Sequence, residues 1–270
     1  MLLEIDSKKV FSSDVGKTFD KNKESIILLH GSGQSHVVWS LTDQYLSDEG
    51  YNVFALDFPG HGNSDGESLK SIEEMAEWIS KVIDSVGYKE ASLVGHSQGC
   101  LVTVECTARY PEKIKTLSLM GGAGAIPMNP ELLALAENND SKAVDLMMDW
   151  AHGPAGHFGG HPVPGLYHIN TGGMLAKSRT IKDTLGVDFR ACDNYKNGFE
   201  AAKKIKIPTL SILATGDKMC PVKEGKKLAD LIDGSKVEII DNCGHMMLLE
   251  EADRVLKVLK KFITTNYPTN

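Results

Sequence analysis

A serine between two glycines is the clearest sign of chemistry in this sequence. The segment 95–99, Gly-His-Ser-Gln-Gly, follows an apolar run at 91–94 and precedes a helix-like stretch at 100–108. On such a strand–turn–helix junction a serine sits on a sharp, strained turn that exposes its hydroxyl. Glycines are needed on both sides because side chains there would collide as the strand and the helix crowd together. We therefore predict that Ser97 is a catalytic nucleophile.

A serine hydroxyl is a poor nucleophile at neutral pH and needs a base, which the end of the chain offers. His245 follows a glycine on a predicted turn between the last strand and the last helix, at the same end of the sheet as Ser97. The imidazolium formed during catalysis needs a carboxylate on its other nitrogen. Asp217, which follows the predicted strand 208–214, can supply it. We predict that the three residues form a Ser–His–Asp triad.

The length and composition are sufficient for one sizeable hydrophobic core and argue against nucleic acid and membranes as partners. The chain has 270 residues, of which 41% are hydrophobic, and a formal net charge of −7. No run of Lys and Arg would track phosphates, so nucleic acid is not an expected partner. The first residues lack the pattern of a signal peptide, and no apolar run could span a bilayer. We expect a cytoplasmic protein without stable membrane insertion, and the sequence leaves its oligomeric state open.

Neither the cysteines nor the histidines suggest a metal site. The cysteines are widely spaced and form no C-x-x-C pair, so we predict reduced thiols. They are Cys100, Cys106, Cys192, Cys220 and Cys243. Four histidines, at positions 152, 157, 161 and 168, lie in a stretch rich in glycine and proline. No carboxylate or cysteine stands among them at a tight ligand spacing, so we expect a polar loop there and no metal or other cofactor.

The elements that position these residues alternate between strands and helices. A hairpin is predicted at 2–5 and 9–12, followed by a series of strands, the first of which is a continuous apolar run that indicates burial on both faces. The predicted strands lie at 25–29, 52–57, 91–94, 115–120, 208–214 and 236–240. Helices are predicted between them, at 37–49 and 72–86 among others, and a last helix at 247–264. Repeated units of this kind predict an α/β protein with a doubly wound, mostly parallel sheet.

One region interrupts the alternation. Residues 121–206 contain no convincing buried strand, whereas connections in such sheets usually take about 2 to 6 residues. Helical patterns occur there at 130–137, 141–150 and 173–185. The segment leaves the sheet after the strand that follows Ser97, so we expect it to lie over the edge where ligands bind. We predict a core of residues 1–121 and 207–270 with an inserted, mainly helical lid at 122–206.

Four motifs in matching order resemble those of the α/β-hydrolase fold superfamily, in its serine-nucleophile, lid-bearing, carboxylesterase-like branch. They are His-Gly-Ser-Gly at 30–33, Asp-Phe-Pro-Gly-His-Gly-Asn-Ser at 57–64, the nucleophile segment at 95–99, and the late pair Gly-Asp at 216–217 with Gly-His at 244–245. The resemblance extends from about residue 25 to residue 262. It implies an α/β-hydrolase fold and acyl transfer without a cofactor.

Further site residues follow from position and from this resemblance. The N–H of Gln98, next to the nucleophile at a helix N-terminus, is a predicted oxyanion donor. The resemblance places the second donor in the loop after residue 30, and we assign it to Ser32. It also implies that 57–64 is a structural turn. Met219 and Met246 adjoin the predicted acid and base, and we predict that they line an apolar substrate pocket.

We predict a serine esterase that cleaves carboxylic esters of small to medium size through an acyl-enzyme on Ser97. A lactonase or a carbon–carbon bond hydrolase on the same scaffold is the alternative. Hydrolases of ring-cleavage products resemble this chain in the loop 30–33. They usually continue it with proline, where Gln34 stands here, and usually have asparagine in place of His96.

Other members of the superfamily fit the motifs less well. Proline iminopeptidases normally carry tryptophan at the position of Gln98, and dehalogenases and epoxide hydrolases use aspartate in place of Ser97. A ligand-binding receptor is a further alternative, because the same fold can serve other functions. Turnover of a simple ester would exclude the receptor.

Overall fold

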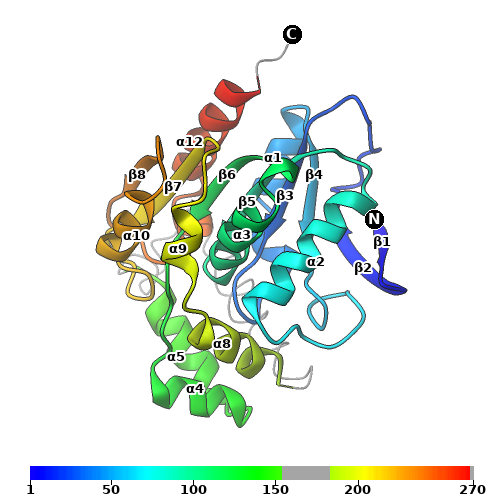
Figure 1. The fold of residues 1–270 in the computed structure, drawn as a ribbon. Coiled ribbons are helices and arrows are strands. Elements are labelled where there is room, and N and C mark those ends of the chain that lie inside the picture. The colour runs from blue at the N-terminus through cyan, green and yellow to red at the C-terminus, as the bar shows by residue number, and fades with distance from the viewer. Residues whose placement is uncertain (154–182, 268–270) are drawn as a thin grey trace.

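The computed structural model describes residues 1–153 and 183–267. Eight strands form one sheet in the order β1-β2-β4-β3-β5-β6-β7-β8 (Figure 1). From β3 to β8 all strands run parallel, which confirms the predicted doubly wound α/β fold. They are β3 (Ser25–Leu29), β4 (Asn52–Leu56), β5 (Ala91–His96), β6 (Ile114–Met120), β7 (Thr209–Ala214) and β8 (Lys236–Ile240).

The predicted N-terminal hairpin lies at one edge of this sheet. It consists of β1 (Leu2–Ile5) and β2 (Lys8–Ser13), which pair antiparallel. β2 also pairs antiparallel with β4, so the hairpin extends the parallel sheet. The hairpin is therefore the antiparallel part of a mostly parallel sheet.

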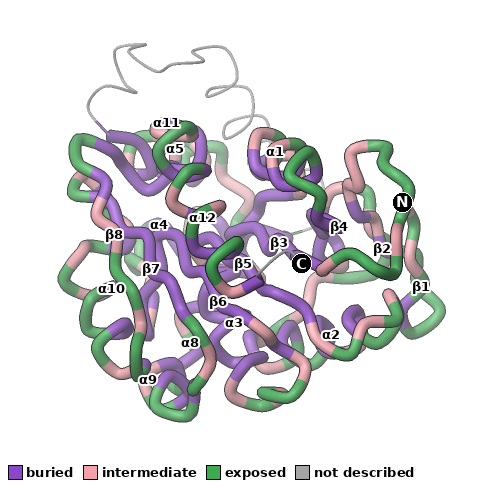
Figure 2. The backbone as a smooth tube through the Cα atoms, turned by 90° about the horizontal axis from the view of Figure 1, so that it is seen from above, coloured by how far each residue is buried: buried purple, intermediate pink, exposed green. Residues whose placement is uncertain are grey.

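The core lies on both faces of the sheet, because successive side chains of a strand point to opposite sides. Ile27 and Leu29 of β3 pack on the side covered by α2 (Ile72–Ser85) and α3 (Gln98–Arg109). Ile26 and Leu28 pack on the other side, which is covered by α1 (Thr42–Asp48), α11 (Met247–Glu250) and α12 (Ala252–Asn266). The central strands are buried, and the outer helical surfaces are exposed (Figure 2). Burial on both faces explains the continuous apolar run of β3.

Two predicted helices are each divided in the structure. The helix expected at 37–49 is a short 3-10 turn, η1 (His36–Trp39), followed by α1. The helix expected at 247–264 breaks at Glu251 between α11 and α12. The apolar spacing continues through both breaks, so it could not reveal them. The second break leaves the buried side chain of Glu250 directed toward the backbone of Gly244.

Where the structure describes it, the connection between β6 and β7 contains helices, as predicted. α4 (Pro130–Glu137) and α5 (Ser141–Ala151) match two expected helices. The third, expected at 173–185, falls mostly outside the described residues, and α8 (Thr184–Asn194) was not predicted. We call α4, α5 and α8 the helical insertion. These helices share a small apolar cluster of their own, which includes Leu132, Met147 and Phe189. That they form a separate lid remains a prediction.

The remaining described helices complete the core. They are η2 (Pro111–Lys113), α9 (Gly198–Ala202) and α10 (Val222–Ala229). Within the described ranges, no helix combines the length and apolarity that a membrane span would need.

Candidate active site

Ser97 occupies the turn between β5 and α3 in a strained backbone conformation. Its φ of +56° and ψ of −120° are values that residues with side chains rarely adopt. A Cβ added at Gly95 would collide with the backbone of Gly99, and one added at Gly99 would collide with the carbonyl oxygen of Leu29. The crowding that required glycine on both sides of the serine is therefore present. The Ser97 side chain lies at the N-terminus of α3 and is half-buried.

His245 and Asp217 form a buried pair. His245 Nδ1 lies 2.8 Å from Asp217 Oδ2, and both residues are at least 95% buried. The other carboxylate oxygen accepts hydrogen bonds from the backbone N–H groups of Met219 at 2.8 Å and Cys220 at 2.7 Å. The carboxylate is thus fixed from both sides. Because Nδ1–H donates to Asp217, the lone pair of the neutral ring lies on Nε2, as a general base requires.

Ser97 and His245 are neighbours but do not form a hydrogen bond. The backbone N–H of Ser97 donates to Met120 O at 3.1 Å, and a Cβ added at the next residue, Gly121, would be 3.0 Å from His245 Nδ1. Among the described residues, His245 Nε2 has no hydrogen-bond partner. Catalytic hydrogen bonds are often long or misaligned without substrate and tighten when it binds. The structure therefore brings the acid and base into contact and leaves the serine beside them.

His96 supports the His245 turn. Its Nε2 lies 3.0 Å from the backbone oxygen of His245, and the two ring centroids are 4.8 Å apart. Burial, with the neighbouring His245, lowers the pKa of His96 to about 3, so its ring is neutral. Nε2–H can then donate to the carbonyl and hold the turn. The sequence had marked His96 only as a departure from one group of hydrolases, and its role in the turn was not predicted.

The loop that follows β3 lies against the nucleophile. A Cβ added at Gly31 would be 3.0 Å from Ser97 Cβ. His30 Nδ1 lies 2.8 Å from Gly31 O, and its Nε2 accepts the N–H of Phe58 at 3.3 Å. Burial lowers the pKa of His30 to about 4, so the ring is neutral and satisfies both contacts. The ring thereby fixes the start of the loop that contains Ser32.

The backbone N–H groups of Ser32 and Gln98, the predicted oxyanion donors, are free of described acceptors. No described residue accepts a hydrogen bond from either group. Both belong to segments next to Ser97, one after β3 and one at the start of α3. Free N–H groups beside a nucleophile are suited to stabilise an oxyanion.

Asp188 of α8, which the sequence reasoning missed, connects the helical insertion to this loop. Its Oδ2 accepts the N–H of Gly33 at 2.7 Å and lies 2.8 Å from His61 Nε2. The residue is fully buried. A signal was present in the sequence, because Asp188 shares the buried face of its helix with Leu185 and Cys192. A carboxylate on an apolar helix face needs a partner, and that partner is distant in sequence.

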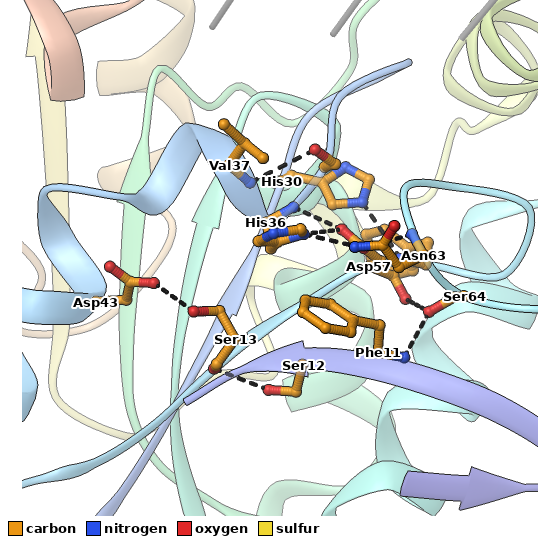
Figure 3. Close-up of polar contacts among 12 residues, drawn as sticks. Phe11, Ser12, Ser13, His30, His36, Val37, Asp43, Asp57, Asn63 and Ser64 are labelled. Atoms are coloured by element: carbon orange, nitrogen blue, oxygen red, sulfur yellow. Dashed lines mark hydrogen bonds and ion pairs between the residues drawn. The ribbon is translucent and has the colours of Figure 1, made fainter. Parts of the chain in front are cut away.

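The segment 57–64 makes contacts typical of a structural turn. The Asp57 carboxylate accepts the backbone N–H of His36 at 2.6 Å, lies 2.8 Å from the ring Nδ1 of the same residue, and accepts the N–H of Asn63 at 2.8 Å (Figure 3). Ser64 Oγ donates to Asp57 O and accepts the N–H of Phe11 (Figure 3). Asp57 is thus engaged in holding loops together and does not contact His245.

Met219 and Met246 adjoin the His–Asp pair in different environments. Met246 is fully buried in the core, where its sulfur accepts a hydrogen bond from Gln34 Nε2 at 3.6 Å. Met219 is partly exposed and packs against both the core and the cluster of the helical insertion. Their role in a substrate pocket remains a prediction.

The cysteines and the histidine-rich stretch give no metal site in the described chain. All five cysteines are buried and free of disulfides, as predicted. Of the four clustered histidines, His152 is described, and the other three lie outside the described residues. Across residues 1–153 and 183–267, no three His, Cys, Asp or Glu side chains are grouped as a metal site would need.

The chain is similar in sequence to known hydrolases. Residues 24–155 match the family described as alpha/beta hydrolase fold. A 2-hydroxy-6-oxononadienedioate/2-hydroxy-6-oxononatrienedioate hydrolase of Escherichia coli is 28% identical over 265 residues, covering 89% of this chain and 87% of that protein. These matches support a hydrolase.

Solved structures share the fold over nearly the whole chain. An enol-lactonase from Burkholderia xenovorans has a TM-score of 0.80 at 22% identity, covering 98% of this chain and 100% of that one. An esterase from Exiguobacterium antarcticum has a TM-score of 0.82 at 19% identity, covering 97% and 98%. Identities this low establish the fold alone. Motif order, sheet topology and the family match agree on the α/β-hydrolase fold for this chain.

Proposed function

We propose that this protein is a serine hydrolase that cleaves carboxylic esters through an acyl-enzyme on Ser97. The observation that supports this most directly is the buried His245–Asp217 pair, 2.8 Å apart, at the same sheet edge as the strained Ser97 turn. A serine, a base with a free nitrogen and an orienting carboxylate are the groups that acyl transfer requires.

Acylation uses these groups in one step. Ser97 Oγ attacks the ester carbonyl carbon while His245 Nε2 takes the hydroxyl proton. Asp217 stabilises the resulting imidazolium, and the N–H groups of Ser32 and Gln98 stabilise the negative charge on the former carbonyl oxygen. The tetrahedral intermediate then collapses. The bond to the alkoxy group breaks, and His245 returns the proton to the departing alcohol.

Deacylation repeats the sequence with water as the nucleophile. His245 accepts a proton from water as it attacks the acyl carbonyl, and the same two N–H groups hold the oxyanion. Collapse of the second intermediate releases the carboxylic acid and returns the proton to Ser97. The protein thereby needs no cofactor for the complete cycle.

The expected substrates are esters of small to medium size with an apolar acyl or alcohol part. Met219, which is partly exposed and lies two residues after Asp217, supports an apolar group next to the scissile bond. Lactones are cyclic esters and undergo the same two steps. The fold shared with an enol-lactonase and an esterase is compatible with both substrate classes.

The test is hydrolysis of p-nitrophenyl esters of increasing acyl length by the wild type and by Ser97→Ala. We expect the variant to lose about 10⁴-fold or more in kcat, because removing a triad member has effects of this order. Ser235→Ala is the matched control, since Ser235 precedes β8 and lies at the opposite end of the strands from Ser97. Equal turnover by the wild type and Ser97→Ala would refute the proposal.

A second candidate function is hydrolysis of a carbon–carbon bond. The specific observation in its favour is the 28% identity to the dienedioate hydrolase over 265 residues. The dienedioate named for that relative, incubated with this protein and followed by chromatography, separates the two reactions. Cleavage of the dienedioate without ester turnover would favour the carbon–carbon hydrolase, and the reverse result would favour the esterase.

A further inference from the structure

Asp188 touches the chain beside both predicted oxyanion donors. Its carboxylate accepts the N–H of Gly33, the residue after Ser32, at 2.7 Å. Its backbone oxygen accepts a hydrogen bond from the side chain of Gln98 at 3.3 Å. One turn further along α8, Cys192 Sγ lies 3.7 Å from Ser32 Oγ. A single face of this helix therefore contacts both segments that carry the donors.

His61 supplies the charge that balances Asp188. One ring nitrogen lies 2.8 Å from Asp188 Oδ2 and the other 3.0 Å from the carbonyl oxygen of Pro59. A carboxylate and a carbonyl can only accept, so both ring nitrogens must donate and the ring is an imidazolium. Both side chains of the pair are at least 98% buried. An imidazolium and a carboxylate buried together compensate each other, and removal of either leaves an unpaired charge.

We propose that Asp188 is a positioning residue for acyl transfer: with His61 as its counter-ion, it holds the loop that carries the oxyanion donor of Ser32. This inference rests on the proposed function. Oxyanion donors act only at about 2.7–3.1 Å from the developing charge, and misplacement by about 1 Å can cost about 100-fold in rate. Asp188 acts through Gly33 and need not touch the substrate. Helix α8 of the insertion thereby affects the rate of acyl transfer through the position of the Ser32 loop.

Three variants of the full-length chain test this role. Asp188→Ala removes the acceptor and the charge, whereas Asp188→Asn keeps an oxygen for the Gly33 N–H and removes only the charge. Asp193→Ala is the matched control, because Asp193 also lies on α8 and also accepts a backbone N–H, from Met128 at 3.0 Å. The control bond joins α8 to the segment between β6 and α4 and does not involve the loop that contains Ser32.

On p-nitrophenyl acetate, we expect Asp188→Ala to lower kcat by about 10- to 100-fold with little change in KM. Asp188→Asn should recover part of this loss, and Asp193→Ala should stay within about 2-fold of the wild type. A purely structural role would instead lower the melting temperature of the Asp188 variants and leave kcat per active site unchanged. Titration of active sites with a fluorophosphonate probe counts the competent molecules.

Amide hydrogen exchange in a peptide covering residues 30–34 gives a readout that needs no turnover. We expect exchange at Gly33 to be faster in Asp188→Ala than in the wild type or Asp193→Ala, because its acceptor is lost. Unchanged exchange at Gly33, or faster exchange with kcat per active site unchanged, would overturn the proposal. If the wild type neither turns over esters nor reacts with the fluorophosphonate, the proposed function fails, and the exchange result still decides whether Asp188 holds the loop.

Discussion

Two of the described contacts that attach the insertion region to the core use buried carboxylates, and the two carboxylates have different partners. At α8, the Asp188 carboxylate meets a cation, His61, and the N–H of Gly33. Beyond the end of α5, the Glu250 carboxylate of the core accepts the N–H groups of Gly153 at 2.9 Å and Gly244 at 3.1 Å. Glu250 has no ion-pair partner in the described part of the chain. One carboxylate thus has an ion-pair partner, whereas the other is hydrogen-bonded to backbone N–H groups.

The two attachments also serve different parts of the candidate site. Asp188 bonds to the loop that carries the predicted oxyanion donor Ser32, and Glu250 bonds to the turn that carries His245. Burial raises the pKa of Glu250 because its N–H donors only partly compensate for lost solvation. For His61, burial lowers the pKa and the Asp188 carboxylate more than offsets this, so the pKa of His61 is raised. We therefore expect the loss of the charged partner of Asp188 to cost more stability than the loss of the N–H contacts of Glu250.

The largest expected effect comes from removing the cation. His61→Ala leaves the Asp188 carboxylate buried without its counter-ion, which should lower the free energy of unfolding by about 3–5 kcal/mol. His61→Gln keeps one N–H donor toward Asp188 and should cost less. Urea unfolding at pH 7 measures both variants.

His36→Ala is the matched control for this prediction. His36 also pairs with a buried carboxylate, that of Asp57, but its side chain is 19% exposed. Asp57 keeps the backbone N–H of Asn63 in that variant, so the loss should be smaller. Equal losses in the free energy of unfolding for His61→Ala and His36→Ala would mean that the His61–Asp188 pair stabilises the fold no more than the His36–Asp57 pair.

A smaller effect is expected at the second attachment. Glu250→Ala leaves the N–H groups of Gly153 and Gly244 without their acceptor, at a cost of about 1–3 kcal/mol in the free energy of unfolding. We also expect kcat on p-nitrophenyl acetate to fall, because the His245 turn loses a constraint. Glu251→Ala is the control, since Glu251 is the next residue and its side chain caps no helix. A fall in stability with unchanged kcat would show that Glu250 does not position His245.

The sequence predicts some parts of this arrangement well because their causes are local. The continuous apolar run at 25–29 places β3, and the strand predicted at 236–240 matches β8, both with the bounds that the structure gives. The turn of Ser97 follows from glycines that lie two residues away on each side. The His245–Asp217 contact spans 28 residues, yet it could be predicted because both residues follow neighbouring parallel strands whose ends meet at one edge.

Asp188 and Glu250 could not be assigned in this way. The contact between Asp188 and Gly33 spans 155 residues, and it depends on how the insertion folds back on the sheet. No local sequence pattern specifies how the insertion packs against the sheet. Glu250 lies in an apolar stretch that continues the helix spacing, so its contact with Gly244 depends on a break that periodicity does not show.

The smallest expected effect is the pH dependence of the stability that the His61–Asp188 pair contributes. A group whose pKa is raised by folding contributes stability that is complete below its unfolded pKa, about 6.5 for histidine, and is lost as pH rises through the folded value. The other described titratable groups that face His61 should not change charge between pH 6 and 9. Burial lowers the pKa of His30 to about 4, and although burial opposes it, the bonds from His36 lower the pKa of Asp57. The advantage of the wild type over His61→Gln in urea unfolding should therefore shrink as pH rises from 6 to 9. A constant or growing difference in the free energy of unfolding would contradict an imidazolium at His61. Asp188 would then resemble Glu250, whose hydrogen-bond donors are neutral N–H groups.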